Sequence, residues 1–229
     1  MVFGKDKHID EPPVPLFPWA EAWEFAISNE ERPAADKRKR PVLGVRAFRV
    51  PHGSGAQRVN APCAFFPRET GTEAQGSQQR LYADAEGRVP LCSIDAPEDI
   101  DGARRFVVRD DAGQPIGAVL RIPPLKHALK PTWRLAQPGR PEIVSSAEWA
   151  AGGVTEMVQQ GAGKFLVGAI QAVADLGAEG GDQTNKARML EWKAEGELVM
   201  TSNGRHGFLI RAAWLDRRLV FSYALLRAR

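Results

Sequence analysis

The chain has 229 residues, 43% hydrophobic and 26% charged, which is the composition of a globular protein with one large or two small domains. Its 31 basic and 28 acidic residues give a formal net charge of +3, which permits an anionic partner but does not by itself indicate one. There is no run of about 20 apolar residues, and the first residues lack the apolar core of a signal peptide. We therefore expect a cytoplasmic protein without a membrane-spanning helix, and the Arg- and Ala-rich usage suggests a bacterial source.

The first 41 residues are predicted to form a partly disordered extension that carries one short helix. Residues 1–13 are polar and contain prolines. In residues 20–28, A-E-A-W-E-F-A-I-S, Trp23 and Ile27 can share a helix face with Phe17 and Trp19, while Glu24 lies on the exposed side. The basic run from Lys37 to Arg40 follows. We interpret it as a solvated linker, and binding of nucleic acid through this run is the alternative.

From residue 42 to residue 229 the pattern predicts a single β-rich domain. Short apolar runs alternate with turns rich in Gly, Pro, Asn and Asp, which is typical of an antiparallel sheet or a closed barrel. Strands are expected at residues 42–50, 81–83, 89–94, 104–109, 115–122, 131–137, 142–145, 187–192, 198–202 and 207–214. Residues 164–176 differ, because their apolar positions have helical spacing, so one helix is expected there.

The last segment, W-L-D-R-R-L-V-F-S-Y-A-L-L-R-A-R, is apolar nearly all round between Leu219 and Leu226. Asp216 precedes it as a candidate N-cap, and Arg227 lies where a cation favours a helix C-terminus. An element of this kind must be covered on every side. The preceding strands can supply that cover, so we predict a buried C-terminal helix.

No motif in the sequence predicts catalysis, a cofactor or a metal site. Gly161-Ala162-Gly163-Lys164 lacks the first glycine and the final Ser or Thr of a phosphate-binding loop. The turn H-G-S-G at residues 52–55 lacks the G-x-S-x-G form of a hydrolase nucleophile. The four histidines are far apart, and the two cysteines have no metal-type spacing, which predicts free thiols.

One basic segment is a candidate binding site. Lys126, His127 and Lys130 lie in a loop between two predicted strands, where they could contact a phosphate or another anionic group. The alternative interpretation is that they only keep the surface soluble.

The hairpin from Arg105 to Arg121, R-F-V-V-R-D-D-A-G-Q-P-I-G-A-V-L-R, resembles the F-x-V-x-D-x-x-G-x-x-x-x-x-V-x-R repeat of tubby-like folds of the LURP-one-related and phospholipid scramblase type. The resemblance covers residues 80–229. It implies a closed antiparallel barrel around a hydrophobic C-terminal helix, here residues 215–226. Tubby itself binds phosphoinositide headgroups through basic residues, but no position of this chain can be matched to those residues.

These observations predict a tubby-like scaffold or binding module for an anionic ligand, a lipid or a protein partner, without chemistry of its own. A hydrolase is one alternative, with a site assembled from His127 or His206 and an acidic neighbour. Nucleic-acid binding through the run from Lys37 to Arg40 is the other.

Overall fold

The fold is known from a computed structural model, which describes residues 12–34, 40–67, 78–123, 132–145, 189–203 and 207–228. Within these residues, thirteen antiparallel strands form one sheet. Strand β5 pairs with β4 on one side and with β7 on the other, which closes twelve strands into a barrel. The mostly β fold predicted from the repeated short strands is thereby confirmed.

The strands are β1 (Glu24–Arg32), β2 (Val42–His52), β3 (Val59–Phe65), β4 (Gln79–Tyr82), β5 (Pro90–Ile94), β6 (Glu98–Ile100), β7 (Ala103–Asp110), β8 (Pro115–Ile122), β9 (Thr132–Ala136), β10 (Ile143–Ser145), β11 (Leu190–Ala194), β12 (Glu197–Ser202) and β13 (Gly207–Ile210). Round the barrel their order is β5, β4, β3, β2, β1, β13, β12, β11, β10, β9, β8 and β7, and β6 is added to the edge of β7. The helical elements described are the short 3-10 turns η1 (Trp19–Glu21) and η2 (Gly55–Gln57) and the helix α4 (Arg217–Arg227).

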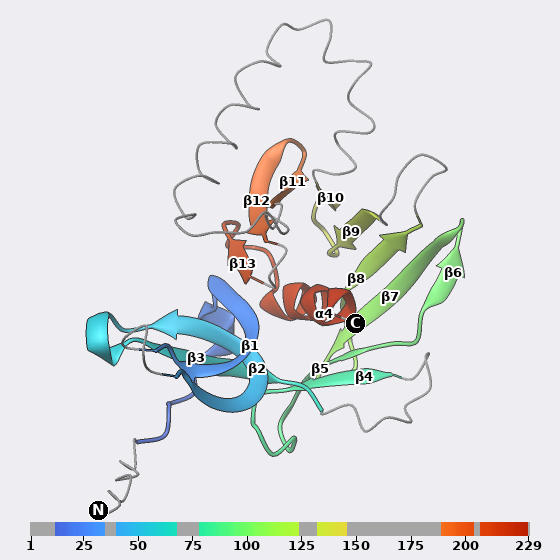
Figure 1. Ribbon diagram of the computed structural model, residues 1–229. Helices are drawn as coiled ribbons and strands as arrows, with labels where there is room; N and C mark the ends of the chain where they lie inside the picture. Colours follow the sequence, from blue (N-terminus) through green and yellow to red (C-terminus); the bar gives the residue numbers. More distant parts are fainter. Residues whose placement is uncertain are drawn as a thin grey trace, which may run out of the picture.

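Helix α4 lies in the middle of the ring of strands (Figure 1). The ring of Phe221 is 4.7 Å from that of Phe25 in β1 and 4.8 Å from that of Phe48 in β2, measured between centroids. On another side of the helix, Tyr223 contacts Trp133 of β9 at 5.4 Å and Trp192 of β11 at 4.7 Å. The helix is therefore the centre of the core, as the all-round apolar segment predicts.

The predicted N-cap of this helix is also confirmed. The side chain of Asp216 accepts a hydrogen bond from the backbone N–H of Arg218, and Arg227 lies in the last turn. The barrel wall comes close to the helix at Gly117 of β8. A Cβ atom at this position would come within 2.5 Å of the Ala136 carbonyl oxygen and 3.0 Å of a Leu219 methyl carbon, so only glycine fits there.

The predicted hairpin is formed by β7 and β8. Its turn is held by the side chain of Asp110, which accepts a 2.7 Å hydrogen bond from the backbone N–H of Gln114. Gly113 in this turn has a positive φ of 81°, a conformation that glycine adopts without steric cost.

The helix predicted at residues 20–28 is wrong. The 3-10 turn η1 comes first and is followed by strand β1, in which Phe25 and Ile27 alternate with more exposed neighbours. Two apolar residues four positions apart, Trp23 and Ile27, suggested a helix face, but pairing with β2 and β13 determines the conformation. The barrel wall therefore begins with β1 rather than at residue 42. The helix predicted at residues 164–176 lies outside the described residues.

The N-terminal segment covers the end of the barrel at which α4 begins. The backbone N–H of Phe17 donates a 2.9 Å hydrogen bond to the carbonyl of Pro62 in β3. The guanidinium carbon of Arg217 lies 4.0 Å from the ring centre of Trp23, and that of Arg218 lies 5.2 Å from the ring centre of Trp19. These cation–π contacts fix the segment against the first turn of the helix. Among the described residues, no helix has the length and apolarity needed to cross a bilayer.

We expect Phe221→Ala to destabilise the protein by about 3–5 kcal/mol, because it removes the ring that contacts β1 and β2 from a fully buried position. Urea unfolding followed by circular dichroism measures the loss. Val89→Ala is the control, because Val89 is 53% exposed. Equal unfolding free energies for Phe221→Ala and the native chain would contradict a core centred on α4.

Candidate functional site

The predicted basic residues Lys126, His127 and Lys130 lie in segment 124–131, outside the described residues. The strand ends that this segment joins are described: Ile122 at the end of β8 pairs with Thr132 at the start of β9. The next pair inward joins Arg121 and Trp133, which are described below.

Four residues form a row across the neighbouring strands β6, β7, β8 and β9. Asp99 of β6 pairs with Arg104 of β7, Arg104 pairs with Arg121 of β8, and Arg121 pairs with Trp133 of β9. Side chains two residues apart share one face of a strand. Arg104 is two residues from Phe106 and Arg121 is two residues from Val119, and both of these are core residues. Arg104 and Arg121 therefore lie on the inner face, and we term them the arginine pair. At this point the strands reach the rim of the barrel, so both side chains are exposed.

The charges of the arginine pair are only partly balanced. Arg104 Nε lies 3.7 Å from a carboxylate oxygen of Asp99, and both side chains are well exposed, so this ion pair is weak. The guanidinium carbon of Arg121 lies 5.6 Å from the ring centre of Trp133. In the part of the chain that the structure describes, Arg121 has no carboxylate partner.

The outer face of the same strands is different. Here Arg105 lies 3.7 Å from Glu98, and Arg134 lies 3.0 Å from Glu142. Each of these arginines has its own carboxylate, so the charge excess is confined to the inner face.

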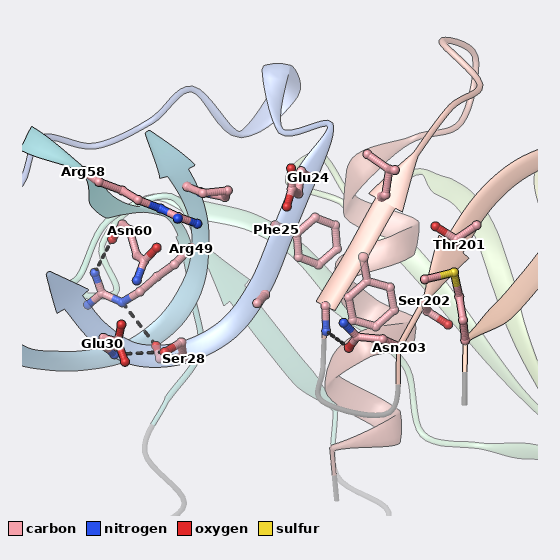
Figure 2. Close-up of a pocket in the computed structure, with 16 residues that line it drawn as sticks. Glu24, Phe25, Ser28, Glu30, Arg49, Arg58, Asn60, Thr201, Ser202 and Asn203 are labelled. Carbon is pink, nitrogen blue, oxygen red and sulfur yellow. Dashed lines mark hydrogen bonds between the residues drawn. The ribbon is translucent and has the colours of Figure 1, made fainter. Parts of the chain in front are cut away.

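A second candidate site is a groove of about 450 Å³ on the outer face of the barrel (Figure 2). This volume is within the usual range for small-molecule pockets. The groove crosses β1, β2, β3, β12 and β13. Its lining residues are Glu24, Phe25, Ala26, Ser28, Glu30, Arg49, Pro51, Arg58, Asn60, Met189, Thr201, Ser202, Asn203, Gly207, Phe208 and Leu209.

Arg49 forms the base of one side of this groove, and its side chain is buried. Register shifts in the β1–β2 and β2–β3 ladders lie close to it. Its guanidinium donates to the carbonyls of Ser28 at 3.2 Å, Asn60 at 2.9 Å and Val45 at 2.7 Å. It also donates to the Glu31 carboxylate at 3.0 Å. One arginine therefore joins three strands where the ladder is irregular.

Two other charged residues of the groove, Glu24 and Arg58, are exposed. Neither side chain has a hydrogen-bond or ion-pair partner in the ranges described above. Figure 2 shows Glu24 on β1 and Arg58 just before the start of β3.

Groups that could do catalytic chemistry are not assembled in the described ranges. His52 is the one histidine there, and its ring contacts the ring of Phe17 at 5.8 Å. Burial raises the pKa of Cys63 and of Cys92 to about 12, so both are neutral thiols near pH 7 and poor nucleophiles. Among the described residues no group of three or more His, Cys, Asp or Glu side chains could hold a metal ion. His8, His127 and His206 lie outside the described residues.

Comparison with known proteins gave no match: no family model, curated protein or solved structure is similar to this chain. Function is therefore inferred from the two surfaces described above.

Neither surface was predicted from the sequence. The arginine pair could have been found, because the correctly predicted hairpin places residues 104 and 121 on opposite strands. The groove could not have been found, because it joins β1 to strands far away in the sequence, and its Glu24 was expected on a helix.

We expect Arg49→Met to destabilise the protein by about 3–5 kcal/mol, because it removes a buried guanidinium and leaves three carbonyls and Glu31 without their donor. Arg49→Lys should also destabilise, since an ammonium cannot reproduce the fork of the guanidinium. Urea unfolding measures both, with Arg58→Gln as the exposed control. An unchanged unfolding midpoint for Arg49→Met would contradict this role.

The buried thiols predict a loss of stability at alkaline pH. Cys63 and Cys92 have an ordinary pKa of 9.0, and burial raises the pKa to about 12 in the folded chain. The unfolded state therefore releases protons first, so the unfolding free energy is unaffected by these groups below pH 9.0 and falls between pH 9.0 and about 12. Urea unfolding across this range should show a shallower fall for Cys63→Ala and Cys92→Ala. Identical slopes would contradict the prediction.

Proposed function

We propose that this chain is a tubby-like binding module whose arginine pair binds an anionic ligand, without chemistry of its own. The observation that carries the proposal is the direct pairing of Arg104 with Arg121 on the inner face at the barrel rim. A barrel that surrounds a C-terminal helix is what the resemblance of the β7–β8 hairpin implies, and it supports the tubby-like assignment.

Like charges directly opposite each other on adjacent strands are unfavourable, by up to about 1 kcal/mol relative to a neutral pair. An anion held between the two guanidinium groups removes this repulsion. Each guanidinium can donate two parallel hydrogen bonds, and the geometry of the donors fits a phosphate or a carboxylate. Asp99 is the one acidic residue of the row, and it lies at the far end, beside Arg104.

The predicted loop residues fit the same proposal. The segment that contains Lys126, His127 and Lys130 begins and ends beside the Arg121–Trp133 pair, because β8 and β9 are joined there. We propose that these residues add positive charge around the arginine pair.

The arginine pair can be tested with inorganic phosphate and with vesicles of phosphatidylcholine that contain or lack phosphatidic acid. We expect Arg121→Gln and Arg104→Gln each to weaken anion binding by about tenfold or more, because each removes charge-assisted hydrogen bonds. Isothermal titration with phosphate and vesicle flotation measure the two forms of the ligand. Binding to phosphate alone indicates a soluble ligand, whereas binding to the acidic vesicles indicates a lipid.

Arg105→Gln is the matched control, because Arg105 lies on the outer face of the same strand and is paired with Glu98. It should leave the affinity unchanged. Equal weakening by Arg105→Gln and Arg121→Gln would show a non-specific charge effect and overturn the proposal. So would the absence of binding to both phosphate and acidic vesicles at low salt.

A further inference from the structure

We infer that the groove on the outer face is a second binding site, which takes a small zwitterion with an ammonium group and a carboxylate, such as an amino acid or a short peptide. This inference is independent of the proposed function. The groove is formed by β1, β2, β3, β12 and β13, whereas the arginine pair lies on β7 and β8.

The register of five strands brings the groove residues into one row. Thr201 of β12 pairs with Leu209 of β13, and Leu209 pairs with Glu24 of β1. On the other side of β1, Pro51 of β2 pairs with Asn60 of β3. The pairing of Ala26 with Arg49 places Glu24 opposite Pro51, two residues further along both strands.

Glu24 and Arg58 are two charged side chains of this surface that have no partner in the described part of the chain. They are of opposite sign, yet they form no ion pair with each other. Neighbouring strands are about 4.8 Å apart, so about 10 Å separates the backbone of Glu24 from that of Asn60, and Arg58 lies two residues before Asn60. Figure 2 shows the two side chains on separate segments, Glu24 on β1 and Arg58 just before β3.

The charge balance of the groove selects the ligand. Its lining contains two acidic residues, Glu24 and Glu30, and two basic residues, Arg49 and Arg58. Arg49 is already paired with Glu31, so the charges left for a ligand are of both signs, with Arg58 as the positive one. A simple anion would be attracted by Arg58 but repelled by Glu24. A simple cation would be attracted by Glu24 but repelled by Arg58. A ligand that carries both charges satisfies both side chains at once.

The uncharged lining residues fit the rest of such a ligand. Pro51 lies between Glu24 and Asn60 in the row and offers an apolar contact. The side-chain amide of Asn60 and the hydroxyl of Thr201 make no hydrogen bond within the described part of the chain, so both can bond to the polar groups of a peptide. The volume of about 450 Å³ accommodates a short peptide.

Binding can be tested by titrating the 229-residue chain with glycine, diglycine and triglycine and following NMR chemical shifts. We expect saturable binding of at least one of these probes. Glu24→Gln and Arg58→Gln should each weaken that binding by about tenfold, the factor for 1.4 kcal/mol. Glu86→Gln and Arg88→Gln are matched controls, because they lie in the turn between β4 and β5, outside the groove, and they should have no effect.

Blocked ligands assign each charge. N-acetyl-diglycine lacks the ammonium group, so Glu24→Gln should no longer change its affinity, and diglycinamide lacks the carboxylate, so Arg58→Gln should no longer change its affinity. The inference is overturned if none of the three probes binds, if acetate binds as tightly as the best of them, or if the control variants weaken binding equally. Arg121→Gln should leave the affinity of the zwitterion unchanged, which separates this site from the arginine pair.

Discussion

The structure depends on the enclosure of α4, a helix whose side chains are apolar on nearly every side. Leu219, Val220, Phe221 and Tyr223 are all fully buried, although they point in different directions round the helix axis. Burying each large side chain contributes about 1.5–3 kcal/mol, and this gain requires cover on every side. A single sheet could cover only one side. The closure of the sheet through β5 and β7 therefore follows from the apolarity of the last segment.

The same enclosure determines where a ligand can bind. The rings of Phe221 and Tyr223 meet aromatic side chains of β1, β2, β9, β11 and β13, so the interior is packed rather than hollow. Recognition is then left to the rim and to the outer face. The arginine pair lies at the rim and the groove lies on the outer face, and the packed core fixes the backbone of both.

The sequence predicted the parts of this fold that depend on local pattern. Asp216 and the run from Leu219 to Leu226 indicated the helix and its cap, and the turn around Asp110 and Gly113 indicated the β7–β8 hairpin. A helix was wrongly predicted at residues 20–28 because Trp23 and Ile27 have helical spacing. The alternation of Phe25 and Ile27, which indicates a strand, is too short to be decisive. Pairing between distant strands, such as β1 with β13, leaves no local signal. The groove depends on such pairs, so its residues could not be predicted.

Arg49 connects the scaffold to the groove. A buried guanidinium is costly unless its hydrogen bonds are satisfied, and here irregular pairing of β1, β2 and β3 supplies the carbonyls that satisfy it. Gly44 leaves room for the Glu31 carboxylate, which supplies the opposite charge, because a Cβ atom at Gly44 would collide with that side chain. The irregular ladder that shapes the groove and the buried charge that stabilises it are thus mutually dependent. The guanidinium of Arg49 is already hydrogen-bonded to the scaffold, so Arg58 is the arginine of this groove that remains available to bind the proposed ligand.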